Sequence, residues 1–271
     1  MNNSLDFDLN RVSELTIKEL KNKCSNLELK QELISVIKVL KKDSRKGVQK
    51  IAAKLERKIA KKEAIVTKWE KMQQLEKEYS QKGYQVIIGI DEAGRGPLAG
   101  PVVAAAVLLD PQNKIYGLDD SKKLNLTKRE NLFKQIKAKA KVGIGQATSS
   151  EIDKYNIREA TFTAMKRAVK DLLPKLQKQP DLLLIDGNAV IPGLTVEQES
   201  IIDGDAKVNN IAAASIIAKV SRDKLIYKYA EEFPEYNLES NKGYGTAEHI
   251  AALKKYGSTP IHRKSFARVP D

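Results

Sequence analysis

Residues 84–271 contain five short apolar runs of β-strand length, and these runs constrain the fold more than any other feature of the sequence. Stretches with apolar residues at helical spacings of three and four lie between and after them. This alternation predicts a mixed α/β domain. A glycine- and proline-rich segment, residues 94–101, joins the first two runs and predicts that they are antiparallel neighbours. The runs are Val86–Ile90, Val102–Leu109, Lys141–Ala147, Leu182–Ile185 and Ser200–Ile202, and the helical stretches are Thr127–Lys139, Ile157–Leu173, Asn210–Phe233 and Ala247–Tyr256.

Residues 1–80 show helical spacing of apolar residues throughout, with Leu15, Leu20 and Leu33 among them. The pattern breaks at residues 41–44 and resumes as far as Leu75. Gly83 is the next strong helix breaker, and after it the helical spacing gives way to short apolar runs of strand length. We therefore predict two parts, a basic helical module of residues 1–80 and an α/β domain of residues 81–271.

Positive charge is concentrated in the first part. The 271 residues carry 48 Lys and Arg against 35 Asp and Glu, a net charge of +13, and residues 1–80 alone hold 19 basic and 12 acidic residues. A cationic surface attracts polyanions, and nucleic acid is the commonest in a cell. A solvated helix face and a protein partner remain alternatives for this module. Membrane-surface binding is disfavoured because no broad apolar face stands opposite the lysines.

The composition excludes several other classes of protein. The single cysteine, Cys24, excludes an internal disulfide framework and a cysteine metal cluster. No apolar stretch reaches the roughly 20 residues that span a bilayer, and the polar N-terminus lacks a secretion signal. We therefore expect a cytoplasmic protein without membrane contact.

Four carboxylates terminate or follow apolar strands: Asp91, Glu92, Asp186 and Asp205. Carboxylates that converge at strand ends repel one another and need a cation. Oxygen ligands of this kind suit Mg²⁺ or Mn²⁺, and two such ions could flank a phosphodiester. Because successive strand residues face opposite ways, we expect Asp91 or Glu92 to lie at a strand end or a bulge.

The glycine loop G-R-G-P-L-A-G, residues 94–100, does not match a dinucleotide fingerprint or a phosphate loop. Its two prolines also oppose a helix at this point. A bare backbone with Arg95 instead suits contact with a sugar–phosphate chain. The two histidines, His249 and His262, show no metal-binding spacing, and we expect them in hydrogen bonds rather than in catalysis.

Several motifs in a fixed order resemble the bacterial ribonuclease HII family. The resemblance covers about residues 84–268, and Arg95, where ribonuclease HIII usually has lysine, favours the HII branch. The motifs are I-G-I-D-E-A-G-R-G-P-L-A-G-P-V-V-A-A-A-V from Ile88, D-D-S-K-K-L from Asp119, L-L-I-D-G-N from Leu183, I-I-D-G-D-A-K from Ile201, I-A-A-A-S-I-I-A-K-V-S-R-D from Ile211 and N-K-G-Y-G-T-A-E-H from Asn241.

The resemblance implies a ribonuclease H fold, a mixed five-stranded sheet flanked by helices. It implies a monomer that uses Mg²⁺ or Mn²⁺ to hydrolyse the RNA strand of RNA/DNA hybrids. It also implies nicking on the 5′ side of single ribonucleotides in duplex DNA, which leaves 3′-OH and 5′-phosphate ends and serves ribonucleotide removal.

The same resemblance assigns site residues. The catalytic, metal-binding set is Asp91, Glu92, Asp186 and Asp205, and the candidate substrate contacts are Gly94, Arg95 and Gly96 with Tyr244 for the ribose 2′-OH, and Ser121, Lys122 and Lys219 for phosphates. Asp203 stands where the family commonly has lysine, and we expect it to face away from the metal. A non-catalytic nucleic-acid-binding protein is the alternative function, although clustered carboxylates disfavour it.

Overall fold

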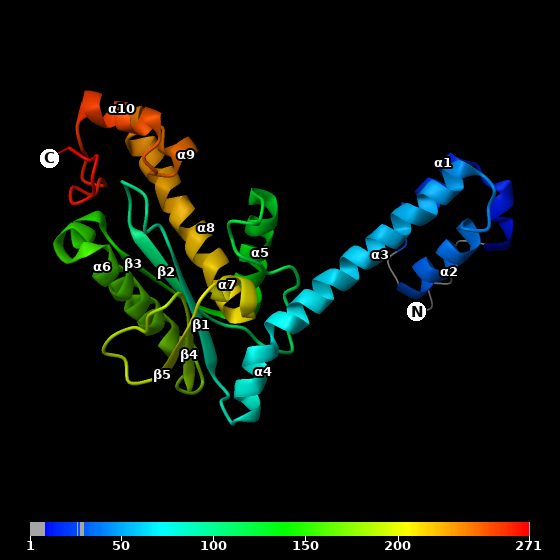
Figure 1. Cartoon of the computed structure of the whole chain (residues 1–271), viewed down its shortest axis with the longest axis horizontal. Helices are drawn as coiled ribbons and strands as arrows, with labels where there is room; N and C mark the ends of the chain where they lie inside the picture. Colours follow the sequence, from blue (N-terminus) through cyan, green and yellow to red (C-terminus); the bar gives the residue numbers. More distant parts are fainter. Residues whose placement is uncertain (1–8, 26, 28–29, 271) are drawn as a thin grey trace. The chain divides into compact units, whose positions relative to one another are not determined.

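The computed structural model describes residues 9–25, 27 and 30–270 and divides into two compact units, residues 1–68 and 69–271 (Figure 1). Residues 69–81 pack with the second unit. The boundary between the two functional modules, predicted after residue 80, stays a prediction. The first elements are η1 (Leu9–Glu14), α1 (Ile17–Ser25), α2 (Lys30–Leu40), α3 (Lys46–Met72) and α4 (Gln74–Gln81).

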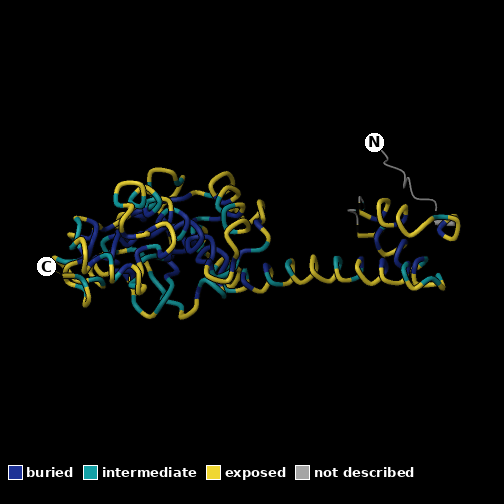
Figure 2. Tube along the Cα trace, turned by 90° about the horizontal axis from the view of Figure 1, so that it is seen from above, coloured by how far each residue is buried: buried dark blue, intermediate teal, exposed yellow. Residues whose placement is uncertain are grey.

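The first unit has its own small apolar core. Leu20, Leu33 and Leu40 are fully buried in it together with Val48 of α3. Arg45 fixes the start of α3, because its guanidinium donates to the Leu15 and Val12 carbonyl oxygens at 2.7 and 2.9 Å. Farther along α3, residues 56–68 include no buried residue (Figure 2). This part of the helix is therefore available for contacts with solvent or a partner.

The second unit is built on a five-stranded sheet of order β3-β2-β1-β4-β5. β1 is antiparallel to β2, and β2 to β3, whereas β4 is parallel to β1 and β5 is parallel to β4. The mixed sheet and the antiparallel first pair confirm the sequence predictions. The strands are β1 (Ile87–Ala93), β2 (Val102–Leu108), β3 (Lys141–Ala147), β4 (Leu182–Asp186) and β5 (Glu197–Ile201).

Two long helices cover the two faces of this sheet (Figure 1). On β2, Ala104 and Ala106 face the core formed with α6, and Ala105 and Val107 face the core formed with α8. This alternation follows from the two-residue period of a strand. The remaining elements are α5 (Leu126–Lys139), α6 (Ser149–Leu172), η2 (Leu173–Lys175), α7 (Gly204–Lys207), α8 (Asn209–Glu232), η3 (Pro234–Tyr236), α9 (Leu238–Asn241) and α10 (Ala247–Tyr256).

The chain after residue 68 is anchored at the N-terminus of α8. Trp69 and Met72 are buried in the core with α5 and α8. The Asn209 side-chain amide donates to the Trp69 carbonyl oxygen at 3.0 Å, and the Asn210 main-chain N–H donates to Glu76 at 2.9 Å. These contacts explain why the segment packs with the sheet domain.

Gly89 of β1 allows α8 to lie directly on the sheet. A Cβ atom at this position would be 2.2 Å from the Asn210 carbonyl carbon and 2.3 Å from the Ile211 nitrogen. Both are main-chain atoms, so no side-chain rotation relieves the clash. Gly89 thus sets the distance between β1 and α8.

We expect Gly89→Ala to lower the free energy of unfolding by about 2–3 kcal/mol, because a core contact is overpacked. Urea unfolding followed by circular dichroism measures this loss. Gly96→Ala is the matched control, since a Cβ there would meet only the Tyr244 ring, at 3.7 Å. Equal stabilities of the two variants would contradict the steric role of Gly89.

Candidate active site

The parallel pairing of β1 and β4 brings the candidate carboxylates to one end of the sheet. Ile90 pairs with Ile185, so Asp91 and Asp186 follow at adjacent positions. Asp186 Oδ1 then accepts the main-chain N–H groups of Gly204 at 2.7 Å and of Asp205 at 3.4 Å. This contact holds the short helix α7, which carries Asp205, against the end of β4.

We expected Asp91 or Glu92 to lie at a strand end or at a bulge, and this expectation is wrong. Both stay in regular register with β2, opposite Ala105 and Ala104, and β1 continues to Ala93. They therefore point to opposite sides of the sheet edge. Asp91 is on the side of Gly89 and α8.

Glu92 points to the other side, towards α6. It lines a cavity of about 270 Å³ together with Asp186, Arg158 and Phe162. Arg95 lies beside it, with Nη1 3.4 Å from Glu92 Oε1. Asp186 thus stands between two acids that face different sides of the sheet.

Burial and mutual repulsion disfavour the ionised form of all four acids. Burial raises the pKa of Asp91 well above its usual value, and the charges of Glu92 and Asp186 raise it further. Burial also raises the pKa of Glu92, although the positive charge of Arg95 lowers it in part. Burial raises the pKa of Asp186 as well. Burial and the neighbouring Asp120 raise the pKa of Asp205 to about 6. Bound positive charge would relieve this strain.

The donor chemistry fits a hard divalent cation, although the side chains form no closed cage. Within residues 9–25, 27 and 30–270, no three His, Cys, Asp or Glu side chains are arranged to hold a metal ion by themselves. The four carboxylates offer oxygen ligands at an open edge and carry an excess of negative charge. Mg²⁺ commonly keeps several waters and takes only one or two carboxylates, so an open set of this kind suits it.

The glycine loop and Tyr244 meet in the structure. Gly96 faces the Tyr244 ring, and the Leu98 N–H donates to the Gly243 carbonyl oxygen at 2.8 Å. The Tyr244 side chain is 48% exposed. A bare main chain and an aromatic hydroxyl therefore form one accessible surface close to the carboxylates.

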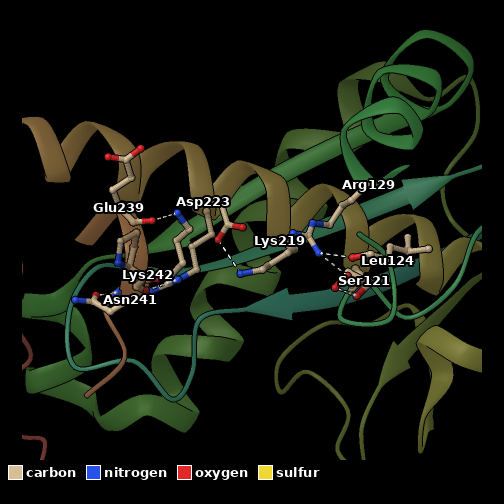
Figure 3. A network of polar contacts seen from close by, with 12 residues as sticks. Ser121, Leu124, Arg129, Lys219, Asp223, Glu239, Asn241 and Lys242 are labelled. Carbon is tan, nitrogen blue, oxygen red and sulfur yellow. Dashed lines mark hydrogen bonds and ion pairs between the residues drawn. The ribbon is translucent and has the colours of Figure 1, made fainter. Parts of the chain in front are cut away.

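The candidate phosphate contacts lie along α8 and the loop before α5 (Figure 3). Lys122 is exposed and close enough to lower the pKa of Asp186 and Asp205. Lys219 Nζ donates to Asp223 at 2.8 Å. Ser121 is 4% exposed: its hydroxyl accepts a hydrogen bond from Ser215 at 3.0 Å, and its main-chain carbonyl oxygen accepts one from Arg129 at 2.7 Å.

Asp203 is exposed, and its charge still lies close enough to raise the pKa of Asp186. The expectation that it faces away from the metal stays a prediction. The Asp203 backbone is left-handed, with φ of 54°, which places it at the turn into α7. Asp205, two residues later, is half-buried. The turn thus separates the two acids.

Two buried arginines that the sequence reasoning missed hold the glycine loop. Arg222 is 1% exposed and donates to the carbonyl oxygens of Pro101, Ala99 and Lys242 at 3.1–3.2 Å. Arg263 is fully buried and donates to those of Gly94, Arg95 and Gly100 at 2.5–3.0 Å. Arg222 lies in α8 between the charged residues Lys219 and Asp223, so its charge alone did not distinguish it. Nothing in the sequence pattern distinguished Arg263 either.

Comparison with known proteins adds independent information. A family model described as Ribonuclease HII matches residues 88–269, and one described as Ribonuclease HII N-terminal domain matches residues 16–80. The chain is 46% identical to the Ribonuclease HII of Clostridioides difficile (strain 630) over 258 residues, which cover 95% of this chain and 99% of that one. It is 45% identical to the Ribonuclease HII of Bacillus subtilis (strain 168) over 259 residues, or 95% and 98% of the two chains.

Solved structures agree with this family. The ribonuclease H2 from Pyrococcus horikoshii OT3 aligns with a TM-score of 0.54 and 27% identity, over 67% of this chain and 94% of that one. The RNase HII structure from Archaeoglobus fulgidus, solved as a PCNA:RNase HII complex, gives 0.56 and 25%, over 67% and 95%. The family expected from the motifs is thus confirmed, and the chain belongs to the ribonuclease HII family of ribonuclease H endonucleases.

Proposed function

We propose that this ribonuclease H endonuclease uses Mg²⁺ or Mn²⁺ to cut the RNA strand of RNA/DNA hybrids. It also nicks duplex DNA on the 5′ side of single embedded ribonucleotides and leaves 3′-OH and 5′-phosphate ends, which suits ribonucleotide removal. The observation that carries this proposal is the meeting of Asp91, Glu92, Asp186 and Asp205 at one sheet edge, beside the glycine loop and Tyr244. Acids crowded beside a bare, arginine-held loop suit a phosphodiester substrate.

The four carboxylates hold the cation, each in a different way. Asp91 is presented by β1 on the α8 side, and Glu92 on the α6 side, where Arg95 favours its charged form. Asp186 is oriented by the N–H group of Gly204. A bound divalent ion supplies charge stabilisation at the phosphodiester and activates water.

The glycine loop and Tyr244 read the ribose. The 2′-OH is the group that distinguishes RNA from DNA, and it both donates and accepts hydrogen bonds. The main chain of Gly94–Gly96 and the Tyr244 hydroxyl offer partners for it on one surface. Ser121, Lys122 and Lys219 are the candidate contacts to backbone phosphates. These phosphate contacts fix position without reading sequence.

The N-terminal module, residues 1–80, binds the nucleic-acid duplex. Four basic residues at spacings of four, three and four share one face of α3, and all are exposed: Lys50, Lys54, Arg57 and Lys61. A cationic stripe of this kind suits a phosphate backbone. Protein-partner binding is the other role that such a surface supports.

Asp91→Asn should abolish cleavage, with a loss of at least about 10³-fold in kcat, because a metal-binding charge is removed. Duplex binding should persist, since the positioning contacts lie elsewhere. The assay compares duplexes with one and with four ribonucleotides, in Mg²⁺ and in Mn²⁺ separately. Asp203→Asn is the control and should remain active. Residual nicking by purified Asp91→Asn at the wild-type rate would refute the assignment.

In the metal-free protein, Asp205 should contribute a loss of stability as pH rises from about 4 through 6. Because the pKa of Asp205 is raised to about 6, the folded state binds more protons than the unfolded state in this range. At pH 8 in EDTA, Asp205→Asn should unfold about 3 °C higher than wild type, and Mg²⁺ should stabilise it less. Thermal unfolding with and without Mg²⁺ measures both, with Asp203→Asn as control. An unchanged Mg²⁺ effect in Asp205→Asn would exclude this residue as a ligand.

Replacing Lys50, Lys54, Arg57 and Lys61 together by glutamine should weaken duplex binding. The slope of log affinity against log salt concentration should become shallower by about two to four, one for each lost phosphate contact. The measurement is fluorescence anisotropy from 50 to 300 mM salt. A variant with four exposed lysines of α5 and α6 replaced, Lys134, Lys137, Lys166 and Lys170, controls for net charge. An identical slope in the two variants would leave the module without a specific electrostatic role.

A further inference from the structure

The chain has two histidines, and they contact each other in the interior of the second unit. His249 is fully buried and His262 is 2% exposed, and their Nε2 atoms are 3.0 Å apart. The ring of Tyr236 packs against both. Burial lowers the pKa of each imidazole, that of His262 to about 4, so both are neutral at pH 7.

The neighbouring groups fix which nitrogen of each ring carries the proton. The main-chain N–H of Thr259 lies 3.0 Å from His262 Nδ1 and can only donate, so this Nδ1 is an acceptor. Neutral His262 then carries its proton on Nε2 and donates to His249 Nε2. His249 in turn carries its proton on Nδ1, which donates to the Tyr244 carbonyl oxygen at 3.0 Å. The hydrogen bonds therefore run in one direction, from Thr259 to Tyr244.

This chain of hydrogen bonds ends on the main chain of the half-exposed tyrosine. The Tyr244 carbonyl oxygen also accepts the Thr246 N–H at 2.8 Å, and the Tyr244 N–H donates to the Asn241 carbonyl oxygen at 2.9 Å. Both main-chain groups of Tyr244 are thus fixed, while its ring remains free beside Gly96. The ring position therefore depends on a buried network rather than on ring contacts alone.

The same histidine segment holds the glycine loop. Residues 261–263 run antiparallel to residues 98–100, and two main-chain hydrogen bonds of 2.8 and 2.9 Å join them. His262 lies at the centre of this bridge, opposite Ala99. One residue thereby connects the two elements that face the ribose.

We propose that His249 and His262 are positioning residues, which hold the Tyr244 main chain at a fixed distance from the glycine loop and so set ribose recognition. This inference rests on the proposed role of Tyr244 in reading the 2′-OH. Neither histidine touches substrate. Their function depends on the neutral, directional pair, because two facing N–H groups at 3.0 Å would repel.

The tautomers can be measured in the wild-type full chain without any activity assay. With ¹⁵N-labelled histidine, only two imidazoles contribute to the spectrum. We expect His262 as the Nε2–H tautomer and His249 as the Nδ1–H tautomer at pH 7. The reverse tautomers, or an imidazolium at either residue, would overturn the inference whatever the substrate proves to be.

Two amide substitutions at His262 separate positioning from general packing. The side-chain amide nitrogen of Gln reaches the position of the imidazole Nε2 and can donate to His249. The shorter Asn side chain reaches only the position of Nδ1, where its oxygen can accept the Thr259 N–H. We expect His262→Asn to lower kcat on a single-ribonucleotide duplex by about 10- to 100-fold, and His262→Gln to restore most of it, since small displacements of a positioned group carry losses of this size. Lys254→Asn, on the exposed face of α10, is the control.

A mutant cycle with Tyr244→Ala then tests whether the histidines act through the tyrosine. In that background, His262→Asn should reduce kcat by less than about threefold, because the two changes act on one contact. The same loss in both backgrounds would refute the proposal. If wild type and Tyr244→Ala cleave equally well, the proposed role of Tyr244 in reading the ribose is wrong. The tautomer measurement is independent of that outcome, because it needs no substrate. Should His262→Asn not fold, the tautomer measurement on the wild-type chain decides.

Discussion

The parallel pairing of β1 with β4 is the constraint on which the candidate site depends. Parallel strands that pair at Ile90 and Ile185 must end at the same edge, so Asp91 and Asp186 become neighbours. Asp186 then binds the first N–H groups of α7 and brings Asp205 to that edge. The resulting repulsion is a consequence of the fold, and a divalent cation is the species that relieves it.

Two buried guanidinium groups give the substrate surface its shape. The glycine loop has few side chains to pack, so its carbonyl oxygens are held by Arg222 and Arg263 from the interior. All the hydrogen bonds that these two groups make in the described part of the chain go to main-chain carbonyls. Burying an unpaired charge is costly, and multiple hydrogen bonds are what make it tolerable. The loop is therefore rigid without bulk, as close contact with a nucleic-acid backbone requires.

In the proposed function, the basic module and the sheet domain divide the chain's charge between two tasks. Residues 1–80 hold 19 of the 48 basic residues, and α3 presents some of them on an exposed face. The same proposal assigns the acidic residues of the sheet domain to the metal and a few of its lysines to positioning the substrate. Separation of this kind allows affinity to vary with salt while the chemistry stays unchanged.

Local pattern was enough to predict the elements but not how their side chains face. Each predicted strand and long helix is present, since apolar periodicity and breakers act within about ten residues. The prediction of a strand end or a bulge at Asp91 or Glu92 was wrong, because strand pairing with β2 continues as far as Ala93. The histidines were expected in hydrogen bonds, yet their mutual contact and their link to Tyr244 were not foreseen.

The sequence by itself determined the α/β class, the helical basic module and the family, and it named the four candidate acids. Only the tertiary structure decided that Asp91 and Glu92 face opposite sides, that residues 69–81 pack on the sheet domain, and that Arg263 holds a loop 163 positions away. Motifs and periodicity report local residue choice, whereas these features arise from contacts between distant segments. Contacts between distant segments produce no regular residue spacing in the sequence, so they cannot be predicted from it.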